Sequence, residues 1–400
     1  MKEVLIKEYN NLKKLNIEPK EGSYTVNFHF IEGAFVEIIG DKPAKFKIEF
    51  INQDNNRLVH ETEITNNMWS KTSIQYYLNF LVKVTNLSTG EIFEHKYNAE
   101  NKRVYIHLDS KAIGDTLAWF PYVDEFRKKH NCQVVCSSFH NQWFESEYPE
   151  IEFIKPGTPA NDLYAMYSIG WHYNEDNEVN TNYNPNDFRK YSLQECSADI
   201  LGIDYKEIKP KLSFRKTIQI DPIEGKYVVI APHASAHAKY WNYPGGWQTI
   251  IDYLNDQGYK VVMITQEPLG DEWHDSKLGG TLTGVIDKTG DYPLKDRATD
   301  IMGAEFFIGV GSGLSWLSWA LGTKTILISG FSAPFSEFQD CERVFTGSPS
   351  ACNSCYNKTR LDAGDWEWCP FHKGTDRHFE CTKTILPSQV TEAIERVRNS

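Results

Sequence analysis

Six short segments between residues 23 and 98 alternate apolar and polar side chains with a period of two, which is typical of half-buried β-strands. Turn-forming pairs such as Gly40-Asp41 and Asp54-Asn55 separate them. The segments are SYTVNFHF, AFVEIIG, KFKIEFIN, RLVHETEIT, YYLNFLVKVTN and EIFEHKYN. This pattern predicts a small antiparallel β domain over 23–101, either a sandwich or a barrel, after a polar tail or short helix over 1–22.

From Lys102 the pattern changes to apolar strands followed by helical periodicity. VYIHLD, LAWFPYVDEFRKKH and CQVVCSSF predict a strand, a helix and a strand, and a second such run starts at Lys226 with YVVIAP, GWQTIIDYLNDQG and YKVVMIT. It continues through GVIDKTG, RATDIMGA, EFFIGV, LSWLSWALG and KTILIS. Such alternation predicts parallel sheets. We therefore expect an α/β fold with two Rossmann-like domains facing a cleft, at 102–215 and 216–385, and a C-terminal helix at 386–400.

Composition and charge narrow the class of protein. The chain of 400 residues carries 42 basic and 54 acidic side chains, a formal net charge of −12. An acidic surface is a poor match for nucleic acid or for an anionic membrane. The N-terminus lacks the apolar core of a signal peptide, and no apolar run is long enough to cross a bilayer. We expect a cytoplasmic protein with no membrane span and no nucleic-acid partner.

In parallel sheets ligands bind beyond the carboxyl ends of the strands, so the loops that follow strands are the informative ones. The first is Ser110-Lys-Ala-Ile-Gly-Asp-Thr116. Gly114 allows a sharp turn into the helix, and Asp115 falls at or near the helix N-cap. Asp115 is therefore either a plain cap or a carboxylate that acts as general base on an acceptor hydroxyl. Gly114 and Thr116, which flank it, are candidates for donor binding.

The second loop, His233 to Trp241, carries Lys239, which has no obvious helical partner and is a candidate for binding phosphate as a compact positive charge. Trp241 is a candidate for lining a sugar or base, although an isolated Trp is more often packed in a core. The histidines His233 and His237 are expected to be solvated rather than catalytic.

A third loop, Gly309-Val-Gly-Ser-Gly-Leu-Ser315, opens a helix with three glycines. Such a turn exposes backbone N–H groups and a positive dipole end to an anion, so the candidates for donor binding here are Gly311, Ser312, Gly313, Leu314 and Ser315. The spacing matches neither a P-loop nor a dinucleotide fingerprint, so a tight turn without a ligand is an equal alternative. Weaker candidates are Thr289, after the strand GVID, and Arg297 on the next helix.

Five of the eight cysteines fall within the last sixty residues. Cys352 and Cys355 form a CxxC pair, thirteen residues separate Cys355 from Cys369, and eleven separate Cys369 from Cys381. Four thiolates at these spacings predict one structural metal ion in a loop over 341–381, and the pattern alone favours zinc. A set of buried thiols is the alternative, and His372 or His378 can replace one ligand.

Several of these motifs together resemble the bacterial autotransporter heptosyltransferases, relatives of the lipopolysaccharide-core heptosyltransferases. They are LDSKAIGDTLAWFPYVDEF, HAKYWNYPGGW, IDKTGDYPLKDR, FFIGVGSGLSWLSWALGTKTILISGFSAPFSEF, CNSC and WCPFHKGTDRHFECT, and the similarity runs over about residues 25–385. The resemblance implies a GT-B glycosyltransferase that moves heptose from ADP-heptose to serines of an autotransporter adhesin in the cytoplasm. It also implies an N-terminal β-barrel that binds the acceptor, a homo-oligomer that is a dodecamer, and iron rather than zinc.

The resemblance also assigns residues. Asp115 matches the catalytic aspartate, Lys239 the phosphate-binding lysine, and the turn around Ser312 the loop that binds the donor phosphates. Cys352, Cys355, Cys369 and Cys381 match the metal ligands. One carboxylate at the reacting face suits an inverting displacement that needs no catalytic metal.

Three other interpretations remain beside this one. A GT-B enzyme with another nucleotide sugar or acceptor shares the same loops. A non-catalytic binding or assembly scaffold is a second, although Asp115 and Lys239 at two different strand ends argue against it. A nucleotide-sugar epimerase is weaker because the dinucleotide fingerprint is missing from the sequence.

Overall fold

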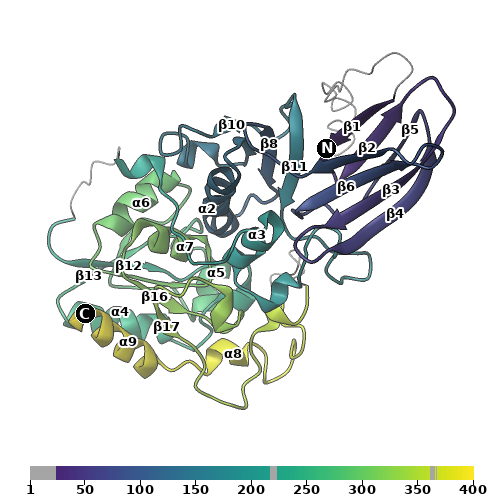
Figure 1. Cartoon of the computed structure of the whole chain (residues 1–400). Helices are drawn as coiled ribbons and strands as arrows, with labels where there is room; N and C mark the ends of the chain where they lie inside the picture. The colour runs from purple at the N-terminus through teal and green to yellow at the C-terminus, as the bar shows by residue number, and fades with distance from the viewer. Residues whose placement is uncertain (1–23, 217–222, 361–364, 366) are drawn as a thin grey trace. The chain divides into compact units, whose positions relative to one another are not determined.

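The computed structural model describes residues 24–216, 223–360, 365 and 367–400 (Figure 1). The predicted tail over 1–22 lies outside these residues. The described chain divides into two compact units. Unit 1 extends to Lys111 and includes Trp119–Phe188 and Glu195–Lys206; unit 2 consists of Ala112–Ala118, Arg189–Gln194 and Glu207–Ser400. Among the described helices, none combines the length and apolar character needed to span a membrane.

The N-terminal part of unit 1 contains two antiparallel sheets (Figure 1). One has the strand order β1-β2-β5 and the other β4-β3-β6-β7. The strands are β1 (Thr25–His29), β2 (Phe35–Ile39), β3 (Lys45–Asn52), β4 (Arg57–Thr65), β5 (Met68–Lys71), β6 (Phe80–Asn86) and β7 (Ile92–Lys96). All six predicted strands are confirmed, and β5 is additional. The described strands pair into these two separate sheets, so the antiparallel β domain is confirmed, and the choice between a sandwich and a barrel stays a prediction.

Alternate residues of these strands form the core of the β domain, as the period of two requires. On β3 the apolar side chains of Phe46, Ile48 and Phe50 are fully buried, whereas the residues between them are partly exposed. Val82 and Val84 on the neighbouring strand β6 follow the same rule. The hydrophobic pattern thus fixes which face of each sheet is buried.

Unit 1 also contains a four-stranded parallel sheet with the order β10-β9-β8-β11. Its elements are β8 (Arg103–Leu108), α2 (Ile113–His130), β9 (Gln133–Ser137), η2 (Asn141–Trp143), β10 (Glu152–Ile154), β11 (Leu163–Ile169), η3 (Phe188–Lys190) and α3 (Leu193–Leu201). The first predicted strand, helix and strand are therefore confirmed. The first residues of α2 and of α3 belong to unit 2 and the remainder to unit 1.

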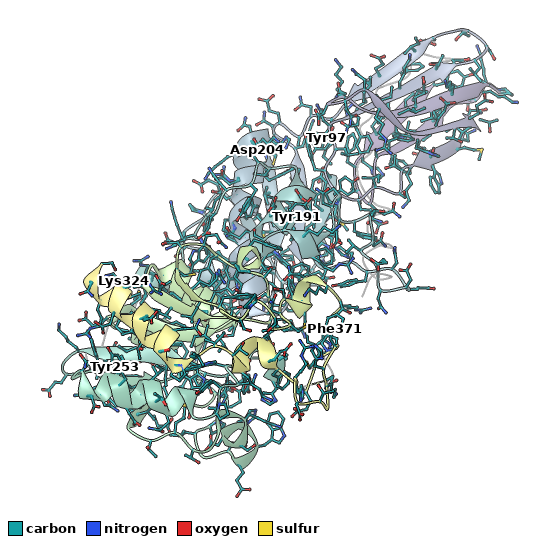
Figure 2. All side chains as sticks on the ribbon, turned by 90° about the horizontal axis from the view of Figure 1, so that it is seen from below. Tyr97, Tyr191, Asp204, Tyr253, Lys324 and Phe371 are labelled. Atoms are coloured by element: carbon teal, nitrogen blue, oxygen red, sulfur yellow. The ribbon has the colours of Figure 1, made fainter. Side chains whose placement is uncertain are left out.

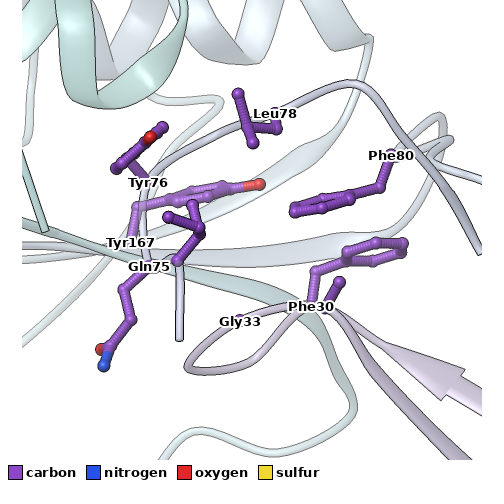
Figure 3. Close-up of a pocket in the computed structure, with 9 residues that line it drawn as sticks. Phe30, Gly33, Gln75, Tyr76, Leu78, Phe80 and Tyr167 are labelled. Carbon is purple, nitrogen blue, oxygen red and sulfur yellow. The ribbon is translucent and has the colours of Figure 1, made fainter. Parts of the chain in front are cut away.

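The β domain is joined to this parallel sheet by backbone hydrogen bonds and aromatic rings. The N–H of Phe30 donates to the carbonyl of Tyr164 at 2.7 Å, and the carbonyl of Phe30 accepts from Met166 at 3.2 Å. Figure 3 shows the small hollow at this junction, lined by Phe30, Gly33, Ala34, Ile74, Gln75, Tyr76, Leu78, Phe80 and Tyr167. The β domain and the first Rossmann-like domain therefore form one compact body rather than two separate ones.

Unit 2 is built on a six-stranded parallel sheet with the order β14-β13-β12-β15-β16-β17. Numbered from β12, this is the order 3-2-1-4-5-6 of the dinucleotide-binding Rossmann fold. The strands are β12 (Tyr227–Ala231), β13 (Lys260–Met263), β14 (Val285–Asp287), β15 (Phe307–Val310), β16 (Thr325–Ile328) and β17 (Glu342–Val344). The order reverses between β12 and β15, and the loops after these two strands contain Lys239 and Ser312.

Helices cover both faces of this sheet, which explains why its central strands are apolar at every position. The helices are η4 (Ser213–Lys216), η5 (His237–Lys239), α4 (Gly246–Asp256), α5 (Glu272–Leu278), α6 (Leu294–Met302), α7 (Gly313–Leu321), η6 (Pro334–Ser336), η7 (Cys355–Asn357), α8 (Glu380–Lys383) and α9 (Pro387–Asn399). Helices α4 and α9 pack together over one face, and the hydroxyl of Tyr253, labelled in Figure 2, donates to Glu395 of α9 at 2.6 Å.

The C-terminal helix predicted at 386–400 is present as α9 (Pro387–Asn399), and its Val390 and Ile394 are fully buried in the core of unit 2. One predicted boundary in this part of the chain is wrong. The metal loop does not begin at residue 341, because Glu342–Val344 pairs with β16 as the edge strand of the sheet. The loop therefore begins after Val344, and Cys341 lies outside it.

Candidate active site and metal centre

Asp115 lies in the first turn of α2, which begins two residues earlier, at Ile113. This agrees with the predicted place at or near the N-cap, and an acidic side chain in the first turn suits the helix dipole. Thr116, the neighbouring candidate, is fully buried, and its hydroxyl donates to the carbonyl of Ala112 at 3.0 Å. Thr116 thus stabilises the helix start instead of offering a free hydroxyl.

The turn that carries Asp115 packs directly on the glycine loop before α7. A β-carbon added to Gly313 would lie 2.7 Å from the β-carbon of Ile113. A β-carbon added to Gly114 would lie 3.0 Å from Cδ1 of Trp316. Only glycine permits backbones to approach this closely. The structure thus brings together two loops that the sequence places about two hundred residues apart.

Within the glycine loop, Ser312 differs from its neighbours in how its side chain is bonded. It occupies the N-cap of α7 with extended backbone, yet its side chain makes no capping hydrogen bond. Its Oγ is buried and has no hydrogen-bond partner in the described part of the chain. An unpaired buried hydroxyl is costly unless a ligand or water satisfies it. By contrast, the Oγ of Ser315 donates to the carbonyl of Val310 at 2.6 Å and so serves the loop itself.

A buried carboxylate that the sequence did not reveal lies beneath this loop. A β-carbon added to Gly311 would lie 2.5 Å from Oε1 of Glu337. Glu337 accepts from the hydroxyl of Ser332 at 2.8 Å and from Nη1 of Arg343 at 2.6 Å. Glu337 follows η6 in the segment FSAPFSEF, where nothing in the residue spacing marks it out. Its carboxylate occupies the space that a side chain at position 311 would need, so only glycine fits there.

Lys239 ends η5, and the negative charges of Asp115 and Glu337 act on its ammonium. Nζ donates to Oγ of Ser235 at 3.2 Å and lies 5.6 Å from the centre of the Phe331 ring. Burial lowers the pKa of Lys239, and the negative charges of Asp115 and Glu337 oppose that shift. Asp115, Glu337 and Lys239 therefore interact electrostatically within unit 2, and the turn of Asp115 packs on the glycine loop.

Trp241 does not belong to this group. Its side chain is 1% exposed, its indole N–H donates to the carbonyl of Ile385 at 2.9 Å, and its ring lies 5.5 Å from that of Trp247. Trp241 is therefore a core residue, the second of the two alternatives given above. Its ring packs against Trp247 of the following helix, α4.

The two histidines of the same loop are not solvated, contrary to our expectation. His233 is 4% exposed, and its Nδ1 lies 3.1 Å from the hydroxyl of Thr265. Burial lowers the pKa of His233 to about 4, so its ring is neutral at physiological pH. His237 is partly buried, and its Nδ1 lies 3.1 Å from Glu367. Both histidines hold the loop in place.

The two weaker candidates, Thr289 and Arg297, shape the neighbouring loop. Arg297 is 5% exposed and donates to the carbonyls of Thr265, Lys288 and Gly290. The hydroxyl of Thr289 donates to Asp287 at 2.7 Å and accepts from the N–H of Leu269 at 2.8 Å. No hydrogen bond among the described residues joins either side chain to Lys239 or to the glycine loop.

The four predicted cysteines converge in the segment that follows β17. Cys355, Cys369 and Cys381 are buried and Cys352 is partly buried. Burial raises the pKa of Cys355 to about 12, and the nearby thiols of Cys381, Cys352 and Cys369 add to that rise. Figure 2 shows the same C-terminal segment in yellow, where Phe371 is labelled. A cation among these thiols would favour the thiolates that burial alone disfavours, so the chemistry of the four side chains is compatible with a metal ion.

A second group borders this site. One ligating atom each from Cys352, His372 and Glu380 lies within 4.8 Å of the others. Glu380 also accepts from the N–H of Cys352 at 2.6 Å and pairs with Arg377. Because these bonds already engage its carboxylate, Glu380 is better suited to orienting Cys352 than to replacing a thiolate.

Substituting Gly313 by alanine is expected to disturb both halves of the glycine-loop contact. The added methyl would press on Ile113 and displace Gly313 or the turn of Asp115, an overpacking that costs about 1–3 kcal/mol. We expect a lower free energy of unfolding, measured by chemical denaturation. Gly347→Ala is the matched control, because its methyl meets only the end of the Gln389 side chain. Wild-type stability in Gly313→Ala would show that the two loops do not depend on this close contact.

We compared the sequence and the structure with those of known proteins. Residues 187–336 match the profile of glycosyltransferase family 9 (heptosyltransferase). An autotransporter heptosyltransferase of Citrobacter rodentium, BAHTCr, is 34% identical over 395 residues, which are 96% of this chain and 92% of that protein. TibC of enterotoxigenic Escherichia coli, described as an iron-containing dodecameric glycosyltransferase, superposes with a TM-score of 0.83 at 30% identity. The match covers 97% of this chain and 98% of TibC.

Two further comparisons bear on activity. A second TibC structure, in complex with ADP-D-β-D-heptose, superposes with a TM-score of 0.82 at 30% identity, over 96% of this chain and 99% of that one. BimC of Burkholderia thailandensis, described as an inactive autotransporter heptosyltransferase, is 30% identical over 81% of this chain and 75% of its own. The two parallel sheets and the loop geometry thus define a glycosyltransferase of the GT-B class. Within that class, the chain belongs to the autotransporter heptosyltransferase family.

Proposed function

We propose that this chain is an active enzyme that transfers heptose from ADP-heptose to serine hydroxyls of an autotransporter adhesin. One observation carries the proposal: unit 2 holds Asp115, Lys239 and the unpaired hydroxyl of Ser312 around a single pair of glycine-dependent loops. A base, a cation and an anion-binding turn are the groups that such a transfer needs.

The donor diphosphate binds at the carboxyl ends of β12 and β15, where the strand order of the sheet reverses. Ser312 donates its hydroxyl to a phosphate oxygen, and the first N–H groups of α7 point toward the same anion. Lys239 supplies the compensating positive charge. As the bond between sugar and diphosphate breaks, these groups stabilise the charge that develops on the leaving ADP, so no catalytic metal is required.

Asp115 accepts the proton of the acceptor serine as its oxygen attacks the anomeric carbon. The bond to the serine oxygen forms while the bond to the diphosphate breaks, which inverts the configuration in a single displacement. Glu337, the other carboxylate that acts on Lys239, is buried and paired with Arg343, so it is unsuited to acting as a nucleophile or base. Of the two carboxylates that act on Lys239, Asp115 is thus the one we assign as base, and one carboxylate in that role suits inversion rather than a covalent intermediate.

The same proposal covers the metal, the assembly and the location. Cys352, Cys355, Cys369 and Cys381 hold one structural ion, iron in analogy to TibC, with zinc as the alternative that the ligands also accept. The ion would bind the four thiolates and stabilise a loop that follows the last strand of the sheet. In further analogy to TibC, we propose a dodecamer that modifies its acceptor adhesin in the cytoplasm.

Two other functions have specific support. A different nucleotide sugar or acceptor would use the same loops, since the groups above contact phosphate and the reacting hydroxyl and not the sugar. A non-catalytic role as a binding or assembly scaffold is supported by the relative that is described as inactive. The proposal of activity is favoured because Asp115, Lys239 and Ser312 are all present and packed together.

The direct test is intact-mass analysis of a serine-rich adhesin fragment after incubation with the purified protein and ADP-heptose. We expect mass increments of one heptose residue each. Increments with another nucleotide sugar only would retain the reaction and overturn the donor. The absence of transfer with every donor, while ADP still binds, would favour the scaffold.

A further inference from the structure

The short helix that carries Lys239 rests on the metal loop. Ala238 packs in one hydrophobic cluster with Phe331, Cys355, Trp368, Cys369 and Phe379, and two members of that cluster are proposed metal ligands. The ring of His237 lies 4.5 Å from that of Phe379 in an edge-to-face arrangement. Two of the three residues of η5 are thus supported by side chains from the metal loop.

Glu367 adds a polar link between the same two segments. It lies two residues before Cys369 in the metal loop. Its carboxylate contacts Nδ1 of His237 at 3.1 Å and accepts from Nζ of Lys277 of α5 at 2.5 Å. One side chain therefore connects the metal loop to η5 and to α5.

A second link joins the residues after η5 to the metal loop near Cys381. Nδ2 of Asn242 donates to the hydroxyl of Thr382 at 3.0 Å, and it also donates to the carbonyl of His237 at 3.2 Å. Thr382 directly follows Cys381. The segment from His237 to Asn242 is therefore fastened at both ends to residues that neighbour the cysteines.

We propose that Glu367 is a positioning residue that couples the metal site to donor binding. In this proposal a metal ion would hold the backbone around Cys369 in one position. Glu367, two residues away, then holds His237 through their contact. Because His237 and Lys239 belong to the same short helix η5, Lys239 is held where it can bind the donor diphosphate. Glu367 itself does not touch the donor. The inference rests on the proposed roles of Lys239 and the four cysteines.

Coupling between two binding sites is reciprocal, which gives a readout that a merely structural ion pair lacks. If the metal loop positions Lys239, bound ADP must in turn stabilise the metal loop in its metal-bound form. ADP should therefore raise the concentration of chelator needed to remove half of the metal. This effect should depend on Glu367.

The experiment compares the full-length protein, with the metal it retains on purification, with Glu367→Gln. Glu395→Gln is the matched control. Like Glu367, Glu395 is partly exposed, pairs with one cation (Arg398) and contacts one aromatic residue, Tyr253, through its hydroxyl. ADP affinity is measured by calorimetry, and metal content by elemental analysis across a chelator titration with and without ADP. We expect about five- to tenfold weaker ADP binding in Glu367→Gln and loss of ADP protection, with both unchanged in the control.

His237→Gln, which cuts the same link from the other side, should reproduce both changes. Wild-type ADP affinity and wild-type protection of the metal in Glu367→Gln would overturn the inference while leaving the proposed function intact. A wild-type protein that binds no ADP, or that holds no metal, would overturn the inference together with the proposed function.

Discussion

Asp115→Asn is expected to abolish most of the sugar transfer while leaving the binding of ADP intact. A positioned general base contributes about 10²–10⁴-fold to a rate, and Asn keeps the size of the side chain without its proton affinity. ADP affinity should stay equal or increase slightly, because the substitution removes a negative charge that acts on Lys239 next to the proposed diphosphate site. Single-turnover transfer and calorimetry with ADP measure the two effects separately.

The control for this experiment is Asp109→Asn. Asp109 lies six residues earlier, directly after β8, and its side chain is exposed. Removal of its charge should leave both turnover and ADP binding unchanged. If Asp115→Asn turned over at a rate close to that of wild type, the base would be another group, and the inverting displacement proposed for Asp115 would fail with it.

Local pattern was sufficient to predict most elements of the fold. Strands such as Lys45–Asn52 alternate along their whole length, so a single register buries one face. The elements that were missed are short or polar. β17 (Glu342–Val344) has only three residues, two of them charged, and it is a strand because β16 offers an open edge. A strand that a neighbouring edge induces has no signature of its own in the sequence.

Some residues of the candidate site could be predicted from the sequence and others could not. Asp115, Lys239 and Ser312 were predicted because each follows a buried strand, and the topology of parallel sheets brings strand ends together. Trp241 was misjudged because the sequence does not show which direction a ring takes after a strand. Glu337 was missed because its role arises from Gly311, whose missing β-carbon makes room for the carboxylate. Such a contact depends on three-dimensional proximity and not on spacing.

The cysteine cluster was predicted in part: the sequence indicates the metal site but not its neighbours. The spacing of Cys352, Cys355, Cys369 and Cys381 predicts a metal site, but the sequence gives no indication of what the metal supports. The structure adds that Cys355 and Cys369 share a hydrophobic cluster with Ala238, next to Lys239. A pattern in sequence thus predicts a chemical group, whereas its connection to a second site requires the fold.

Lys239→Ala is expected to weaken ADP binding by about 10- to 100-fold, since a hydrogen bond to a charged group contributes about 1.5–3 kcal/mol. Transfer should fall further than binding, because the charge on the diphosphate increases as the sugar leaves. Calorimetry with ADP and the transfer assay give the two numbers. Equal affinity in Lys239→Ala and wild type would place the diphosphate elsewhere.

The pH dependence of ADP binding tests whether the charged ammonium of Lys239 is the group that binds ADP. Burial lowers the pKa of Lys239 below its usual value, so the positive charge is present below that lowered pKa and is lost as the pH rises through it. The phosphates of ADP are already ionised above about pH 7. ADP affinity of the wild type should therefore decline at alkaline pH, whereas Lys239→Arg, whose guanidinium stays charged, should bind ADP with an affinity that does not change over the same range. A decline of equal size in both proteins would assign the titration to another group and remove the charge-based role of Lys239.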